Sequence, residues 1–163
     1  MDETRWLDAD EQRTWRAFLL ATKLVDQTLD RQLQRDAGMP HAYYIILVAL
    51  SESPGRAVRM SELAAMTNSS LSRLSHAVAR LEEQGWVRRE KCVDDKRGNL
   101  AVLTDDGFRV LASAAPGHVE QVRTSLFDPL TPQQVVQLRE ICRAVIAKLD
   151  PEAQTALLTF LRG

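Results

Sequence analysis

Residues 61–104 read SELAAMTNSSLSRLSHAVARLEEQGWVRREKCVDDKRGNLAVLT, and this stretch decides the fold. In its second half, residues 85–104, two runs of alternating apolar residues flank a charged segment that contains aspartates and a glycine. Such a pattern is typical of a β-hairpin. Lys96 and Arg97 fall at the tip of this hairpin. The sequence therefore predicts a narrow basic wing of two strands, which can reach into a groove of DNA.

The first half of the same stretch predicts a helix-turn-helix. A two-turn helix over residues 61–66 is followed by a polar turn and by a second helix from about Ser70 to Gln84, which Gly85 terminates. The apolar residues of the second helix recur at helical spacing and are expected to pack inward; they are Leu71, Leu74, Val78 and Leu81. A helix-turn-helix followed at once by a wing is a winged helix-turn-helix, whose second helix enters the major groove of DNA.

The opposite face of the second helix carries the polar side chains that such recognition needs. Arginine can hydrogen-bond guanine edges or phosphates, serine can contact either, and the amides of a helix N-terminus favour anions. The candidate DNA-binding residues of the turn and helix are Asn68, Ser69, Ser70, Ser72, Arg73, His76 and Arg80. On an isolated helix the same residues would form an ordinary solvated face. The adjoining basic hairpin favours DNA binding.

Further helices are predicted on both sides of this motif. A capping box at residues 8–11 opens a long amphipathic helix that ends near Gly38, and a more apolar helix follows it up to residues 53–55. Downstream, helices are expected to open at Thr104, Thr131 and Pro151. We therefore expect one mainly α domain with a small β-wing over residues 1–163, in which a winged helix-turn-helix over 40–108 lies between helices over 8–38 and 116–162.

Charge and composition limit the possible functions. The net charge is −1, but residues 56–104 carry +3 and the rest of the chain −4, which favours a DNA-reading module beside a separate assembly region. No apolar run is long enough to span a membrane, and the two cysteines lack metal-ligand spacing, so we expect a cytoplasmic protein that needs no cofactor. The three histidines fall on different elements and no nucleophile or phosphate-loop motif is present, which argues against an enzyme.

About half of the chain resembles the MarR family of bacterial transcriptional regulators. The similar segments are SELA at 61–64, SSLSRL at 69–74, LEEQGWVRR at 81–89, DKRG at 95–98 and VLTDDG at 102–107. The resemblance implies a homodimer built from the terminal helices, residues 8–38 and 116–162. It also implies that the dimer binds a palindromic operator in double-stranded DNA and represses a nearby gene.

The resemblance also assigns roles in the wing. Arg97 corresponds to the arginine that enters the minor groove, and Asp95 to the carboxylate that orients it, although aspartate is also an ordinary turn residue. Arg89 corresponds to an arginine at the junction of helix and wing, which either contacts phosphate or only braces the wing. The candidate wing residues are Arg89, Lys91, Asp95, Lys96 and Arg97.

Members of this family commonly release DNA when a small, often aromatic anion binds between the dimerisation helices and the winged helix. Trp15, His41 and Tyr44 are the candidate ligand-binding residues, and each has a structural alternative: core packing for the two aromatic residues and a helix-start position for the histidine. Cys92 on the wing is a further candidate for redox sensing, although a strand cysteine is usually a small apolar residue.

Two other functions compete with a regulator. A winged helix can serve as a protein-interaction module that has no DNA role, or as an architectural protein that binds DNA without sequence preference. The +3 charge of the middle segment argues against the first alternative. Salt dependence separates them further, because binding that neutralises phosphates releases counterions.

Overall fold

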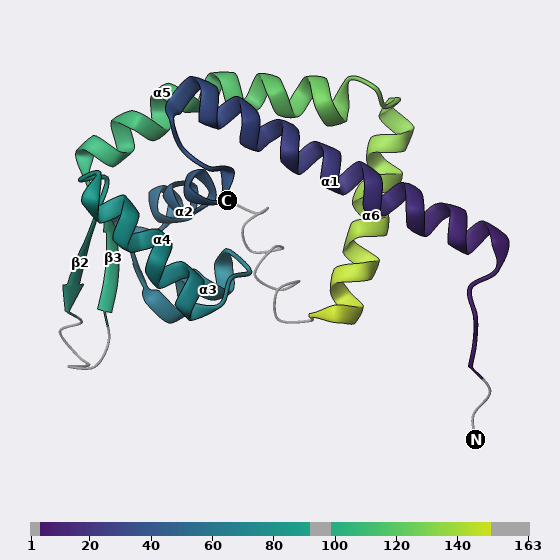
Figure 1. The fold of residues 1–163 in the computed structure, drawn as a ribbon, viewed down its shortest axis with the longest axis horizontal. Helices are drawn as coiled ribbons and strands as arrows, with labels where there is room; N and C mark the ends of the chain where they lie inside the picture. The colour runs from purple at the N-terminus through teal and green to yellow at the C-terminus, as the bar shows by residue number, and fades with distance from the viewer. Residues whose placement is uncertain (1–3, 92–98, 151–163) are drawn as a thin grey trace.

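The structure, a computed structural model, describes residues 4–91 and 99–150. It confirms a mainly α fold with a small antiparallel sheet (Figure 1). In chain order the elements are α1 (Ala9–Ala37), α2 (His41–Glu52), a 3-10 turn (Pro54–Arg56), β1 (Ala57–Arg59), α3 (Met60–Met66), α4 (Leu71–Glu83), β2 (Val87–Lys91), β3 (Asn99–Leu103), α5 (Asp105–Val122), a π-helical turn (Arg123–Phe127) and α6 (Pro132–Leu149). The wing tip and the predicted last helix, which opens at residue 151, lie outside the described residues.

The predicted helix starts at Asp8, Thr104 and Thr131 are confirmed by their capping contacts. Asp8 and Glu11 form a reciprocal capping box at the start of α1, and Thr131 with Gln134 does the same for α6. The Thr104 hydroxyl accepts a hydrogen bond from the Gly107 amide at the start of α5. These contacts satisfy amides that have no partner within the helix, which is why the sequence signals locate the helix starts well.

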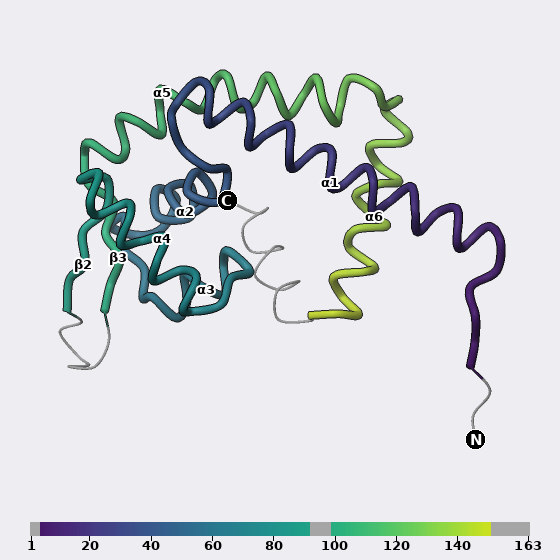
Figure 2. The backbone as a smooth tube through the Cα atoms, in the orientation of Figure 1, coloured from purple at the N-terminus to yellow at the C-terminus, as the bar shows by residue number. Residues whose placement is uncertain are grey.

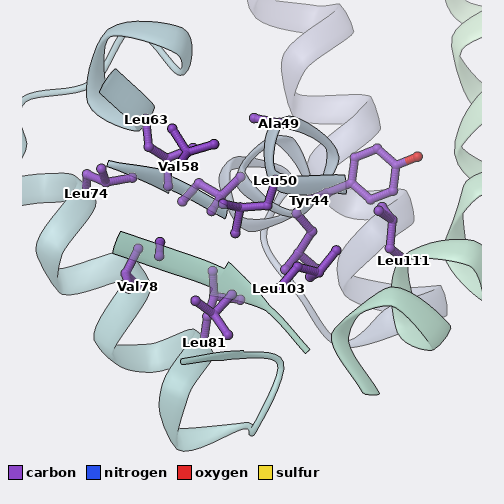
Figure 3. Packing of buried hydrophobic residues seen from close by; sticks show 14 of the residues in the cluster. Tyr44, Ala49, Leu50, Val58, Leu63, Leu74, Val78, Leu81, Leu103 and Leu111 are labelled. Atoms are coloured by element: carbon purple, nitrogen blue, oxygen red, sulfur yellow. The ribbon is translucent and has the colours of Figure 1, made fainter. Parts of the chain in front are cut away.

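The core lies where α2, α3 and α4 meet the sheet (Figure 3). The strands are ordered β1-β3-β2, and both pairs are antiparallel. Leu74, Val78 and Leu81 of α4 are buried as predicted, but Leu71 is 54% exposed, so its assignment to the inward face was wrong. Leu71 is the first residue of α4 and lies next to the turn.

Two long helices pass over this core. α1 and α5 pack side by side along part of their length, and the N-terminal part of α1 extends well beyond α5 (Figures 1 and 2). Every residue of α1 from Ala9 to Leu24 is exposed, and no residue of α6 is buried. The apolar side chains of these segments therefore have little cover from residues 4–91 and 99–150; they include Trp15, Phe18, Leu20, Leu24, Val136, Ile141, Val145 and Leu149.

Candidate nucleic-acid interface

The turn between α3 and α4 is a tight, hydrogen-bonded loop. The amide of Asn68 donates to the carbonyl oxygen of Ala65 at 3.1 Å, and the amide of Ser69 donates to that of Ala64 at 2.9 Å. Asn68 has a φ of 47°, in the left-handed region that asparagine tolerates better than most residues. The Ser70 hydroxyl accepts a hydrogen bond from the Arg73 amide, so it caps α4. The turn therefore fixes where the recognition helix begins.

The outer face of α4 presents the predicted polar side chains to solvent. Ser72, Arg73, His76 and Arg80 are all exposed, on the side opposite the buried leucines. Arg80 pairs with Glu83 one turn further along, with Nη1 and Oε2 2.8 Å apart. An exposed pair of this kind contributes little to stability, so Arg80 can exchange its partner at small cost.

A hollow of about 840 Å³ lies between α4 and the first turns of α2. Five of the seven residues predicted for the turn and recognition helix line it together: Asn68, Ser69, Arg73, His76 and Arg80. The opposite wall comes from α2, with Tyr43 and Ile45 among its residues. The apolar pattern of α2 predicted a core helix. It did not predict that residues in the first turns of α2 also line this hollow.

In the wing, Arg89 is held against the recognition helix. Its guanidinium donates to the Ser75 carbonyl oxygen at 2.8 Å and pairs with Glu82, with Nε and Oε2 3.2 Å apart. The alternative in which Arg89 braces the wing is therefore the one these contacts favour. Lys91 is exposed at the end of β2. Cys92, Asp95, Lys96 and Arg97 lie outside the described residues.

The candidate ligand-binding residues His41 and Tyr44 lie at the junction of α1, α2 and α5, and His118 of α5 joins them. The His118 ring centroid is 4.3 Å from that of Tyr44 and 5.4 Å from that of His41. His41 Nδ1 lies 3.2 Å from a carboxylate oxygen of Asp26, and its amide donates to Asp30. Burial, with a smaller contribution from His41, lowers the pKa of His118. Tyr44 is also part of the core, so its structural alternative holds.

Two buried polar atoms at this junction have no hydrogen-bond partner: Gln32 Oε1 on α1 and His118 Nδ1 on α5. Gly117 gives Gln32 room, since a Cβ there would lie 3.3 Å from the Gln32 amide nitrogen. Sequence reasoning missed Gln32 and His118, because neither belongs to a motif and only tertiary packing brings His118 to His41 and Gln32 to Gly117.

Trp15 does not join this cluster within one chain. It is 51% exposed and stacks on Phe18 with ring centroids 6.1 Å apart. Eleven residues separate it from Asp26, about 16 Å along a helix. Trp15 is therefore not packed in the core of the chain, so the alternative of core packing was wrong for this residue.

Among residues 4–91 and 99–150, no group of three or more histidine, cysteine or acidic side chains could hold a metal ion. Within the same ranges, no helix is long and apolar enough to cross a membrane. Cys142 is exposed on α6 and forms no disulfide.

A helix-turn-helix with a capped recognition helix, followed by an antiparallel wing, defines the winged helix-turn-helix class. A model described as the MarR family matches residues 37–98. The transcriptional regulator HosA of Escherichia coli O127:H6 is 32% identical over 102 residues, which span 62% of this chain and 73% of HosA. The transcriptional repressor MprA of E. coli K12 is 24% identical over 121 residues, which span 74% of this chain and 68% of MprA.

Solved structures extend the similarity to nearly the whole chain. Sco3205, a MarR family transcriptional regulator from Streptomyces coelicolor solved in complex with DNA, is 57% identical with a TM-score of 0.89, over 94% of this chain and 96% of that one. AbsC, a MarR family regulator from the same organism, is 41% identical with a TM-score of 0.86, over 91% and 100% of the two chains. The chain belongs to the MarR family of transcriptional regulators, and its relatives here are regulators rather than enzymes.

Proposed function

We propose that this protein is a homodimeric regulator that binds a palindromic operator and represses transcription in the cytoplasm. The observation that carries the proposal is the hollow between α4 and the first turns of α2, where five residues predicted for DNA binding gather. The 57% identity to Sco3205, which was solved in complex with DNA, supports the same function for this chain. Residues 40–108 would read DNA, and residues 8–38 and 116–162 would form the dimer.

The spacing of the arginines suits a major groove. Arg73 and Arg80 lie on one side of α4, seven residues and about 10 Å apart along the helix axis. That distance corresponds to about three base-pair steps of 3.4 Å on one strand. Either guanidinium can bind guanine edges or phosphate, and the capped N-terminus of α4 favours an adjacent phosphate. In this proposal α4 supplies the sequence reading, and the wing, with Arg97, contributes minor-groove contacts.

The exposed apolar surface of the two ends of the chain supports dimerisation. Side chains such as Phe18, Leu20, Ile141 and Val145 are 48–60% exposed in one chain. Large exposed apolar patches on monomers mark interaction sites, and two-fold symmetry would pair the recognition helices about one helical turn of DNA, or 34 Å, apart. Cys142, exposed in one chain, would then be buried at this interface, as we expect from the apolar side of its helix.

We further propose that a small, often aromatic, anionic effector loosens the DNA-bound state at the junction of α1, α2 and α5. The support is two unpartnered buried atoms: Gln32 Oε1 could accept a hydrogen bond from a ligand, and His118 Nδ1, whose ring lies against His41 and Tyr44, could donate or accept one. α5 follows β3 of the wing after a single residue, so a shift at this junction would move the winged helix relative to the dimerisation helices. Trp15 remains a predicted contact.

The test is selection of bound duplexes from a random pool by the purified full chain, at two salt concentrations. We expect an enriched palindrome whose half-sites lie about one helical turn apart, and steep salt dependence. Salt-dependent retention without an enriched sequence would favour an architectural DNA-binding protein. The absence of salt-dependent retention would favour a protein-interaction module. Either result would overturn the proposed function.

A further inference from the structure

The wing is held against the recognition helix through one residue, Arg89, which binds α4 at two positions, Glu82 and Ser75. The Glu82 carboxylate accepts a hydrogen bond from the Arg89 amide at 2.9 Å through Oε1, and its Oε2 lies 3.2 Å from Arg89 Nε. Arg89 Nη2 reaches further back along α4 and donates to the Ser75 carbonyl oxygen at 2.8 Å. Both side chains are about two-thirds buried, with exposed fractions of 31% and 32%. The contact is therefore better shielded than an ordinary surface ion pair.

We propose that Glu82 is a positioning residue for DNA recognition, because it holds Arg89 and so sets where the wing lies relative to α4. The inference rests on the proposed function. Ser75 and Glu82 are seven residues apart, about 10 Å along the helix axis. These two anchors bind the same guanidinium, and Glu82 also binds the Arg89 amide, so together they fix both the position and the direction of β2 at its middle residue, which a single contact cannot do.

The same contacts remove Arg89 from the set of phosphate-binding residues. Its charge is balanced by Glu82, and its Nε and one Nη already have acceptors within the chain. A phosphate contact would require breaking a partly buried, hydrogen-bonded pair and leaving Glu82 without a partner. Arg89 therefore acts on DNA through the placement of β2, the strand that leads to the predicted groove-binding Arg97.

The sign of the expected effect separates this role from simple electrostatics. Glu82 is a negative charge on the helix that faces DNA. If charge alone mattered, its removal would tighten DNA binding, because a repulsion with phosphates would be lost. If Glu82 positions the wing, its removal weakens operator binding, although the protein becomes more basic.

The experiment compares Glu82→Gln and Glu82→Ala with the neighbouring Glu83→Gln in the full chain. Glu83→Gln is the matched control, since it removes the same charge from an adjacent exposed position and only releases Arg80. For the operator selected from the random pool, we expect a loss of affinity of about tenfold for Glu82→Gln, more for Glu82→Ala, and no loss for Glu83→Gln. Unchanged or tighter operator binding by both Glu82 variants would overturn the proposal.

Arg89 supplies a second test through the salt dependence. A lost phosphate contact lowers the slope of log affinity against log salt by about one, whereas a lost positioning contact leaves it unchanged. We expect Arg89→Ala to lose operator affinity with an unchanged slope. We also expect Arg89→Lys to fall with it, since lysine cannot bridge both anchors. A slope lowered by one, with Arg89→Lys behaving as the wild type, would identify a phosphate contact and overturn the proposal.

A measurement without DNA keeps this proposal separate from the proposed function. Hydrogen exchange of the β2 amides should accelerate in Glu82→Ala and not in Glu83→Gln, with helix content unchanged in both. If the wild type selects no DNA sequence, the proposed function fails, but the exchange result still shows whether Glu82 holds β2 against α4. If exchange in β2 is equal in the wild type and Glu82→Ala, the proposal is wrong whatever the protein binds.

Discussion

Substitution of Gly107 by alanine should destabilise the fold at the joint between the wing and α5. An added Cβ would lie 2.1 Å from the Trp86 carbonyl oxygen and 2.8 Å from Leu103 Cδ1. Normal contact needs more than 3 Å, so the helix start would have to move by about 1 Å. The Trp86 oxygen also accepts hydrogen bonds from the amide and hydroxyl of Thr104, at 3.0 and 3.1 Å, and that movement would disturb both.

The size of the effect follows from these contacts. Overpacking of this kind costs about 1–3 kcal/mol, and each weakened hydrogen bond about 1 kcal/mol. Alanine in a helix returns about 1 kcal/mol relative to glycine. We therefore expect the free energy of unfolding to fall by about 2–4 kcal/mol.

The assay is urea unfolding of the full chain at one fixed protein concentration, because dimerisation would make stability depend on concentration. Gly117→Ala is the matched control in the same helix. A Cβ there would lie 3.3 Å from the Gln32 side-chain nitrogen and 3.8 Å from an Asp36 carboxylate oxygen, with no backbone atom in the way, so its stability should change much less than that of Gly107→Ala. If Gly107→Ala is as stable as the wild type, the steric reasoning is refuted.

Three further predictions concern recognition, pH and assembly. If Arg73 reads a base, Arg73→Ala should weaken the free energy of binding to the selected operator by about 1–3 kcal/mol and to random duplex by less, as measured by competition binding. Equal losses on both would mean that Arg73 only contacts phosphate. Because folding lowers the pKa of His118, the His118 side chain binds a proton more tightly in the unfolded chain than in the folded one. The free energy of unfolding should therefore fall as pH drops below about 6.5. In urea unfolding measured from about pH 7.5 to 5, His118→Asn should reduce this dependence of stability on pH. Ile141→Asp should shift the chain towards monomer in sedimentation equilibrium, whereas Gln137→Asp, at an exposed polar position of the same helix, should not.

Local chemistry accounts for what could be predicted from the sequence. The capping boxes at Asp8 and Thr131 and the spacing of Leu74, Val78 and Leu81 depend on neighbours within a few residues, and the structure confirms each. These signals were enough for the helix-turn-helix, the wing strands and the outer face of α4.

Relations that only tertiary packing creates could not be predicted. The double anchor of Arg89 needs the wing folded back onto α4, and the contact of His118 with Tyr44 needs α5 packed on α2. Periodicity also cannot tell burial within a chain from burial between chains. Trp15 shows this limit: its place on an apolar stripe predicted core packing, but its side chain is half exposed in the chain.

The lack of buried residues in α6 has a consequence for how the protein folds. An isolated helix of 18 residues is only marginally stable in water, whatever its capping box contributes. In the proposed dimer, α6 would take much of its order from contacts with the partner chain. Dilution below the dissociation constant of that dimer would then lower the helix signal in part while the core around α4 stays folded, so that α6 would become ordered only when the dimer forms.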